Sequence, residues 1–477
     1  MNVQITWLDF QAILPELILV GFALFGLLYG AFFRRSSDYI LPYVFIVGLS
    51  AALVTTYMLP DERMFAFYKM VVADKISMIL SVVFILTALL TILLSLSYNE
   101  NVKLEFTEYY PLLILSTIGM MLMAKANHFI IFFLGLETMS IALYVLAGFR
   151  KFNKFSLESS LKYFLLGAFA TGILLYGFAL MYGEIGSTYL HDIKTYFQTH
   201  GLDLPVILYL SLGLIIVGFG FKVALVPFHM WTPDVYQGAP IPVTAFMAIG
   251  AKAAGFAAII RIFLDATFHI SIEWSGVFWI LAVLTMIVGN ISALVQDNIK
   301  RMLAYSSIAH AGYILIAVVS ADEAHSIYNI LFYLFVYGIM NIAAFAVVDL
   351  VSGEKEKYVD INHFAGLGFK NPLLGFAFTI ALVSLAGLPP TAGFMGKLYI
   401  FSTAVNNGHI TLVIIGVLNS LVSVYYYLRP VVYMYMKEEN KDVAIKTVYP
   451  AAGLALLITI WGILHLGIFP GFFNVLF

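Results

Sequence analysis

The stretch KVALVPFHMWTPDVYQGAPIPVTAFMAIGAKAAGFA, residues 222–257, decides the fold. Its long apolar runs place Lys222 and Lys252 in surroundings that otherwise suit the interior of a membrane. A charge at bilayer depth costs about 3 kcal/mol or more, so such residues usually serve a function. Pro227 follows five residues after Lys222 and predicts an interrupted helix, because proline removes a helical hydrogen bond. The stretch therefore predicts a polytopic membrane protein with ionisable groups in its interior.

The composition of the whole chain indicates the same class. Of its 477 residues, 62% are hydrophobic and 11% are charged, and the mean hydropathy is +0.96. Because ordinary soluble proteins are about 25% charged, we expect an integral membrane protein. The net charge of −2 gives no electrostatic case for nucleic acid. The absence of cysteine excludes disulfides, thiolate metal sites and cysteine-bound iron–sulfur clusters.

About fourteen apolar segments are long enough to cross a bilayer, which requires about 20 residues. They lie near residues 10–33, 39–59, 75–98, 109–124, 128–149, 158–182, 205–228, 241–265, 272–295, 302–320, 325–351, 372–402, 408–436 and 448–469. The polar gaps between them leave no room for a soluble domain. The expected fold class is an all-α polytopic membrane protein with about 14 transmembrane helices.

Proline interrupts two of these segments. The seventh contains Pro227, and the twelfth, SLAGLPPTAGFMGK, contains Pro389 and Pro390. Broken helices at corresponding places in two halves are typical of inverted repeats with a site at the break. Segments four to eight form one unit of five, and segments nine to thirteen form another. Because five is an odd number of crossings, the second unit starts on the opposite side of the membrane and is inverted relative to the first. The expected units are 1–108 with three helices, 109–265 and 272–436 with five each, and 437–477 with one.

The positions of Lys and Arg predict the orientation, because basic residues are enriched in cytoplasmic loops. With the N-terminus outside, the inner loops hold more than twice as many Lys and Arg as the outer loops. Both termini are therefore expected on the outer face. The inner loop HMWTPDVYQGAPIP, residues 229–242, has no Lys or Arg, so we expect it to pack against protein.

Three further candidate residues are charges within apolar segments: Glu137, Lys162 and Lys397. Glu137 is about 14 Å into its segment at 1.5 Å per residue, and we expect Lys222 to be its partner. Lys162 is only a few residues into its segment, so its side chain could also extend to the surface. Each charge has an alternative reading as a structural contact. The functional reading is a proton path, since burial and neighbours shift the pKa values of carboxylates and lysines.

Other polar residues near these segments are further candidates. His310, in YSSIAHAGY, lies within the tenth segment and is either a proton relay or a packing residue. His229 and Asp234 follow Pro227 and either gate a path or cap the loop. Tyr425–Tyr427 are expected in packing or in an aromatic belt at the membrane surface.

The sequence contains no recognisable catalytic motif. It lacks a Walker A sequence, a GxGxxG turn and an HExxH helix. The histidines mostly lie at segment ends, so no facing pair for a haem is expected. Glu16 is expected near the outer surface.

Four stretches resemble one known family in the expected order: residues 222–257, LGLETMSIALYVLAGF, RMLAYSSIAHAGY and SLAGLPPTAGFMGK. They resemble the antiporter-like membrane subunits of respiratory complex I, the proton-pumping NADH:quinone oxidoreductase. Within that family, PDVYQGAPIPVTAF is similar to the subunit N branch. The resemblance covers essentially the whole chain.

The resemblance implies a proton line formed by Glu137, Lys162, Lys222, Lys252 and Lys397. It implies no cofactor in this chain, because flavin, iron–sulfur clusters and quinone belong to partner subunits. The implied partners are other membrane subunits of complex I, including the antiporter-like subunit M and the small subunits, together with membrane lipid. The implied location is a bacterial-type inner membrane.

Three alternatives stay open at this stage. A subunit of a cation/proton antiporter or of a membrane-bound hydrogenase shares the same fold. A purely structural scaffold would tolerate Leu or Met in place of the buried lysines. The third alternative is an enzyme acting on lipid or quinone, but the sequence contains no nucleophile or metal constellation for such a reaction.

Overall fold

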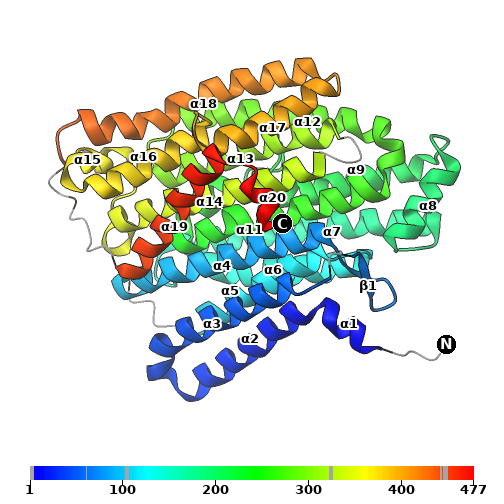
Figure 1. Ribbon diagram of the computed structural model, residues 1–477, viewed down its shortest axis with the longest axis horizontal. Helices are drawn as coiled ribbons and strands as arrows, with labels where there is room; N and C mark the ends of the chain where they lie inside the picture. Colours follow the sequence, from blue (N-terminus) through cyan, green and yellow to red (C-terminus); the bar gives the residue numbers. More distant parts are fainter. Residues whose placement is uncertain (1–4, 61, 103–106, 322–325, 441–442, 444–448) are drawn as a thin grey trace.

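The fold is seen in a computed structural model that describes residues 5–60, 62–102, 107–321, 326–440, 443 and 449–477. The first residues of the predicted segments 325–351 and 448–469 lie outside this range. The described chain is almost entirely helical (Figure 1). Its two short strands, β1 (Met64–Ala66) and β2 (Val71–Ala73), form an antiparallel hairpin.

The helices fall into an N-terminal group, two longer series and a C-terminal pair. They are α1 (Trp7–Ala12), α2 (Leu14–Phe32), α3 (Arg34–Tyr57), α4 (Lys75–Val102), α5 (Tyr109–Ala124), α6 (Phe129–Ala147), α7 (Lys154–Ile185), α8 (Leu190–His200), α9 (Val206–Lys222), α10 (Thr232–Gly238), α11 (Ile241–Ile259), η1 (Ile260–Ala266), η2 (Phe268–Ile270), α12 (Ser271–Leu294), α13 (Ile299–Val319), α14 (Ser326–Ser352), η3 (Glu354–Glu356), η4 (Ile361–Phe364), α15 (Leu367–Lys370), α16 (Pro372–Ala386), α17 (Ala392–Asn406), α18 (Ile410–Met436), α19 (Pro450–Ile468) and α20 (Phe472–Leu476).

Within the described residues, 11 helical stretches are long and apolar enough to cross a membrane. The shorter apolar helices α5, α9 and α16 fill the remaining predicted positions. Each predicted segment therefore corresponds to a helix or, for the twelfth, to the pair α16 and α17. The all-α polytopic class is confirmed, and the figure of fourteen crossings stays a prediction.

The centre of the bundle is formed by α11, α13 and α14. Every residue of α11 is buried, and nearly all of α13 and α14 is buried as well. These helices are apolar on all sides, so they have no polar face to turn outward. The last long helix, α19, packs against α4, α14 and α17. The C-terminal part of the chain therefore returns to its N-terminal part (Figure 1).

Both predicted helix breaks are present. Helix α9 ends at Lys222, and α10 begins only at Thr232. Helix α16 ends at Ala386, Gly387 has a φ of +83°, and α17 begins at Ala392. Each break brings a helix end and its unpaired carbonyls into the bundle, where a hydrogen-bond donor can reach them.

The segment after the first break packs against protein, as predicted from its lack of Lys and Arg. Helix α10 lies against α7 and α13. Thr232, Pro233, Val235 and Tyr236 of this helix are buried.

Helices α5 and α6 pack closely at a glycine, and so do α12 and α13. A Cβ atom on Gly119 of α5 would come within 2.4 Å of the backbone nitrogen of Met139 in α6. A Cβ atom on Gly289 of α12 would come within 2.7 Å of the backbone nitrogen of Ala309 in α13. Glycine allows such close approach because it has no side chain.

A second local feature also recurs in the two series. His128 and Asn298 each cap the second helix with a side chain that accepts a backbone N–H bond. Each also forms an isolated antiparallel bridge with the segment after the third helix, His128 with Tyr189 and Asn298 with Asp360.

Candidate functional site

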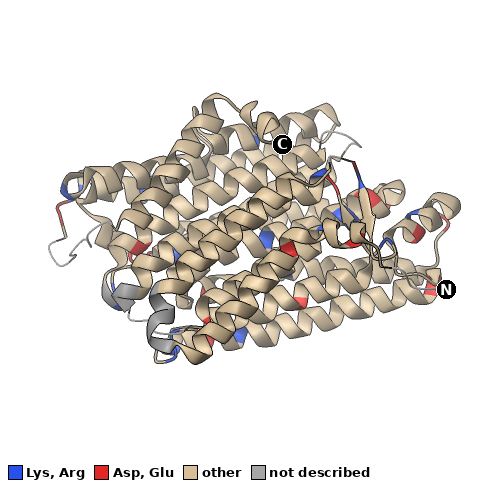
Figure 2. Cartoon of the chain, turned by 60° about the horizontal axis from the view of Figure 1, so that its bottom comes forward, with Lys and Arg blue, Asp and Glu red and all other residues tan. Residues whose placement is uncertain are grey.

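Three of the predicted lysines, Lys222, Lys252 and Lys397, lie in the core and share one environment. Their residues are 3%, 3% and 4% exposed, respectively. Each ammonium group donates to a serine hydroxyl on another helix and lies beside a tyrosine ring. Among the described residues, no carboxylate lies within 4.0 Å of any of the three. Figure 2 shows that most charged residues lie toward the ends of the helices and only a few lie between.

Lys222 is the last residue of α9 and sits at the first break. Its Nζ donates to Ser140 Oγ on α6 at 2.8 Å. The rings of Tyr144 and Tyr163 lie 5.7 and 5.4 Å from the ammonium, within the range of cation–π attraction. Both tyrosine hydroxyls are buried and make no hydrogen bond to the part of the chain that the structure describes.

Lys252 lies in the middle of α11, the helix that is buried throughout. Its Nζ donates to Ser307 Oγ on α13 at 2.6 Å and also to the Ser307 carbonyl. The ring of Tyr337 on α14 is 5.5 Å away. A third helix therefore completes the environment of this ammonium.

Lys397 lies on α17, and its side chain reaches into the second break. Its Nζ donates to the carbonyls of Ala386 at 2.8 Å and Leu385 at 3.3 Å, which end α16, and to Ser420 Oγ on α18 at 2.9 Å. The negative end of the α16 dipole favours a cation at this point. Straight-helix counting from the sequence could not place this lysine, because the break changes the path of the chain.

His310 bridges the region between Lys252 and Lys397. It is 1% exposed on α13 and is hydrogen-bonded to the hydroxyls of Tyr333 at 2.7 Å and Tyr427 at 3.1 Å. Tyr427 is also hydrogen-bonded to Ser306, the residue before the serine that binds Lys252. Tyr427 is fully buried, as expected for a packing residue, and its hydroxyl in addition joins two helices in the core.

Aromatic side chains connect the first lysine to the second. The Tyr163 ring beside Lys222 stacks on Trp231 at 4.5 Å between centroids. Trp231 contacts Tyr236 edge-on, and the Tyr236 hydroxyl lies 3.5 Å from Ser307 Oγ.

Glu137 does not contact Lys222, so the expected ion pair is absent. Glu137 is half-buried on α6, three residues before Ser140, which takes the hydrogen bond from Lys222 instead. Positions three apart share a helix face, and Glu137 still contributes to the electrostatic field at Lys222. The reason for the error is that the sequence shows two opposite charges but not which side chains the folded helices bring into contact.

Lys162 lies outside the buried line. Its side chain is 39% exposed and pairs with Glu158 and Asp234, each at 2.6 Å. Asp234 also accepts from Arg301 at 2.7 Å. Burial alone would raise the pKa of the Asp234 carboxyl, but the hydrogen bonds from Lys162 and Arg301 outweigh it and hold the pKa below its usual value. Asp234 therefore ties α10 to α7 and α13 as a carboxylate.

The residues expected at the gates are nearer the surface. Pro227 is exposed and His229 half-buried in the first break, and burial lowers the pKa of His229. Pro389 and Pro390 are exposed in the second break. They interrupt the helix as predicted, while the side-chain chemistry at that break belongs to Lys397.

Other buried cations are paired with carboxylates, unlike the three core lysines. Lys125 pairs with Glu16 at 2.7 Å, and both side chains are buried. Lys300 pairs with Glu356 at 2.9 Å. The Arg261 guanidinium donates two hydrogen bonds of 2.6 Å to Asp74.

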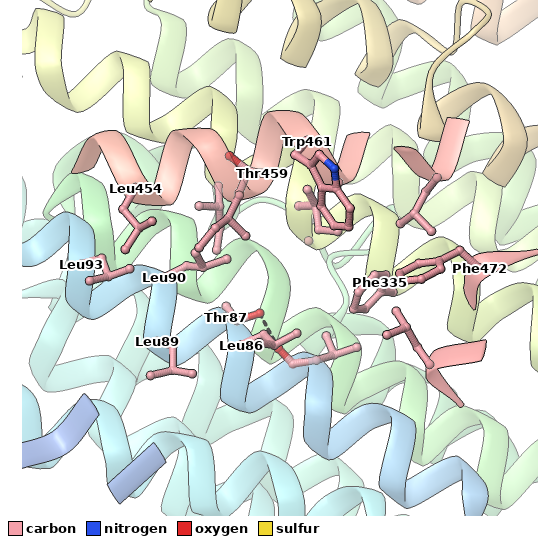
Figure 3. A pocket seen from close by; sticks show the side chains of 18 of the residues that line it. Leu86, Thr87, Leu89, Leu90, Leu93, Phe335, Leu454, Thr459, Trp461 and Phe472 are labelled. Carbon is pink, nitrogen blue, oxygen red and sulfur yellow. Dashed lines mark hydrogen bonds between the residues drawn. The ribbon is translucent and has the colours of Figure 1, made fainter. Parts of the chain in front are cut away.

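A cavity of about 490 Å³ lies between α4, α14, α19 and α20 (Figure 3). Its lining is apolar, and its two threonines, Thr87 and Thr459, bond to carbonyls of their own helices. None of the lysine-site residues lines it. In the described part of the chain, no group of three or more His, Asp or Glu is placed to hold a metal ion.

Comparison with known proteins agrees with this arrangement. Residues 126–423 match the family described as NADH:quinone oxidoreductase/Mrp antiporter, TM. NADH-quinone oxidoreductase subunit N of Trichlorobacter lovleyi is 48% identical over 97% of this chain and 95% of that protein. A chain of respiratory complex I from Thermus thermophilus, solved with bound aureothin, is 36% identical with a TM-score of 0.82, covering 96% of this chain and 97% of that one.

A chain of the Mrp complex from a Dietzia species has a TM-score of 0.85 and covers 97% of this chain and 95% of that one, but it is only 20% identical, which shows the fold alone. Fold and core lysines together define an antiporter-like membrane subunit. The chain belongs to the NADH:quinone oxidoreductase/Mrp antiporter family and, within it, to the subunit N family of NADH-quinone oxidoreductases. The resemblance predicted from the four motifs is therefore confirmed.

Proposed function

We propose that this chain is a proton-translocating membrane subunit of a respiratory NADH-quinone oxidoreductase. Protons pass along Lys222, Lys252, His310 and Lys397, with Glu137 modulating the first lysine and Lys162 acting at the inner side. The energy comes from redox chemistry in other subunits. Electrostatic interactions couple that chemistry to proton translocation in this chain.

One observation carries this proposal: the core lysines have neutral partners. Lys222, Lys252 and Lys397 are held by serine hydroxyls, backbone carbonyls and tyrosine rings. Lys125 and Lys300, which are buried as deeply, each have a glutamate. A carboxylate fixes a buried ammonium in its charged state, whereas neutral partners leave a lysine able to release its proton. The two groups of lysines are therefore built for different tasks.

The rival transport reading, a cation/proton antiporter subunit, rests on fold similarity. The Mrp chain and the complex I chain resemble this fold about equally, but the sequence identity is 20% against 36%. Sequence identity therefore favours the oxidoreductase. The scaffold reading offers no reason for lysines with neutral partners, because a leucine would cost less at each position.

The proposal includes the surroundings of the chain. Other membrane subunits, subunit M and the small subunits among them, lie beside it, and they or their soluble partners hold the flavin, iron–sulfur clusters and quinone. The membrane is a bacterial-type inner membrane with both termini on the outer side. The apolar groove of Figure 3 and the many exposed leucines and phenylalanines suit contact with such subunits or with lipid.

The proposal also includes two inverted repeats, 109–265 and 272–436, between units 1–108 and 437–477. The recurring glycine contact, the recurring bridge before the second helix and the break in the fourth helix support it.

The test replaces each core lysine by methionine in the assembled complex. We expect Lys222→Met, Lys252→Met and Lys397→Met to assemble fully and to lose most NADH-driven proton translocation. Lys125→Met is the matched control: it leaves Glu16 buried and unpaired, so it should lower stability and assembly instead. Normal translocation in all three core variants, at normal assembly, would reduce the lysines to structural residues.

Glu137 needs a separate experiment because it does not touch Lys222. Glu137→Gln should weaken translocation, and the effect should vanish in the Lys222→Met background if Glu137 acts through that lysine. Equal effects of Glu137→Gln in both backgrounds would show that Glu137 acts elsewhere.

A further inference from the structure

A row of buried polar groups on α14 leads from Lys252 toward the predicted inner end of the bundle. Tyr337, Asn341 and Asp349 are each at most 1% exposed. Tyr337 and Asn341 are one helical turn apart, and Asp349 lies about 12 Å further along at 1.5 Å per residue. Unsatisfied polar groups are costly inside a membrane protein, so such a row requires partners or water.

The end of the row near Lys252 has polar atoms without protein partners. The Tyr337 hydroxyl and Asn341 Oδ1 are buried and make no hydrogen bond to the described chain. The side chains of Ser307 and Asn341 flank this hydroxyl, and the Tyr337 ring is 5.5 Å from Lys252 Nζ. Buried water binds in proteins where several donors and acceptors face one another in this way.

The other end of the row meets a charged cluster. Ser97 of α4 donates to Asp349 at 3.5 Å. Lys300, Tyr98 and Tyr109 are within the electrostatic reach of Asp349. Each of these groups comes from a different helix, α13, α4 or α5, so Asp349 lies at a junction.

The cluster continues to the surface at the predicted inner side. Glu356 accepts hydrogen bonds from Lys300 at 2.9 Å and from Tyr98 at 2.7 Å, and it pairs with Arg150 at 2.9 Å. Its neighbour Lys355 is exposed. Two carboxylates, Glu356 and Asp349, therefore lie between the surface loop and the buried part of α14.

Helix α4 also carries buried polar side chains. Thr91 lies six residues before Ser97, and its buried hydroxyl makes no hydrogen bond within the described residues. Helix α4 packs against both α11 and α14, the helices of Lys252 and Asn341.

We propose that Asp349, Asn341 and Tyr337 form a branch that supplies Lys252 with protons from the inner side. A proton taken up by the Asp349 carboxylate gives the neutral acid. The proton then passes through water held by Asn341 and Tyr337 to the neutral amine of Lys252, leaving an ammonium there and a carboxylate at Asp349. This branch rests on the proposed function, and it adds an inner supply that does not pass through Lys222.

Water access along the branch is tested by single-cysteine labelling, since the chain has no cysteine of its own. In inside-out membranes, a small charged methanethiosulfonate reagent added to the medium should label Asn341→Cys. It should label Ala344→Cys, the matched control on the same buried helix, much more slowly. Equal labelling of the two positions, or labelling of Asn341→Cys only from the opposite face, overturns the branch.

Proton supply is tested by translocation in the assembled complex. Asp349→Asn and Asn341→Leu should lower NADH-driven translocation severalfold, and Asp349→Glu should restore most of it. The loss in Asp349→Asn should grow as the pH of the inner medium rises, because fewer protons then reach Lys252, and it should not depend on the pH of the outer side. A mere packing defect would not distinguish the two sides.

The proposed branch and the proposed path along Lys222, Lys252, His310 and Lys397 can be contradicted independently. If Asp349→Asn and Asn341→Leu translocate at the parent rate at every inner pH while Lys252→Met does not, the branch is wrong and the path stands. If Lys252→Met also translocates normally, the proposed function itself fails.

Discussion

Lys222 Nζ donates a hydrogen bond of 2.8 Å to Ser140 Oγ, one turn of α6 after Glu137. The ammonium therefore has a neutral hydroxyl as its direct partner on α6, and the Glu137 carboxylate makes no direct contact with it. A direct pair would fix the ammonium, whereas a charge acting at longer range changes its energy by a smaller and adjustable amount. This separation suits a lysine that must both hold and release a proton.

The first prediction concerns Lys222→Arg. Arginine preserves the positive charge but does not release its proton, so translocation should fall at least about tenfold. Assembly should persist, because the charge and most of the volume are retained. The measurement is NADH-driven proton uptake by inside-out vesicles. Lys154→Arg, at an exposed position of α7, is the control and should match the parent; parent-level translocation by Lys222→Arg itself would show that Lys222 carries no proton.

The second prediction concerns the turn at the second break. A Cβ on Gly387 would lie 2.8 Å from Lys397 Cδ and 3.1 Å from its Nζ, so Gly387→Ala should displace this lysine and lower translocation severalfold. Gly408 has nearly the same backbone, with φ values of +81° and +83°, but nothing lies within 4 Å of its Cβ position. Gly408→Ala should therefore show only the backbone strain of about 1 kcal/mol. Similar losses in both variants would assign the effect to strain.

The third prediction concerns the Tyr427 hydroxyl. Tyr427→Phe removes the group that joins His310 to Ser306, so proton transfer between Lys252 and Lys397 should slow while the ring still packs. Tyr425→Phe is the control two residues earlier on α18, where the side chain is 64% exposed. The measurement is the translocation rate at full assembly. A parent-like rate for Tyr427→Phe would remove this hydroxyl from the path.

The fourth prediction concerns the pair of Asp74 and Arg261. Asp74→Asn leaves a buried guanidinium without its carboxylate, which should cost about 3 kcal/mol or more. The measurement is the thermal stability of the purified complex, with Asp192→Asn at an exposed position as control. Translocation per assembled complex should be unchanged.

The same pair has a defined pH dependence. Burial raises the pKa of Asp74, but the charge and hydrogen bonds of Arg261 outweigh this and hold it below its usual value. A lowered carboxyl pKa contributes stability that is complete above the unfolded value and is lost as the pH falls through the folded value. The stability difference between Asp74→Asn and the parent should thus stay constant above about pH 4 and shrink only below it. A difference that shrinks near neutral pH would contradict this assignment.

Hydropathy predicted the helices and the burial of Lys222 and Lys252, because each lies far from the ends of an apolar run. Lys397 follows a helix break, so counting along the helix could not place it. The serine partners could not be predicted, since they lie 82, 55 and 23 residues away in sequence. Only packing of separate helices brings these side chains together.

The environment of Lys162 was harder to predict from the sequence. Its position a few residues into an apolar run left both burial and extension to the surface open, and only the resemblance placed it in the proton line. A bundle helix also has a face that turns outward, and hydropathy does not say which face a residue occupies. The acidic neighbours Glu158 and Asp234 draw its side chain to that side. The packing role of Tyr427 could be predicted, but its hydrogen bonds to Ser306 and His310 could not, because both partners lie on another helix.

The position of α18 has a mechanical consequence. This helix is exposed along much of its length, yet its inward face provides Ser420 to Lys397 and Tyr427 to His310. A change in the tilt of α18 therefore changes the distance between a hydroxyl and an ammonium in the core. Bilayer thickness and the lateral pressure of whatever borders α18 set that tilt. The surroundings of the protein therefore influence the lengths of hydrogen bonds in its core.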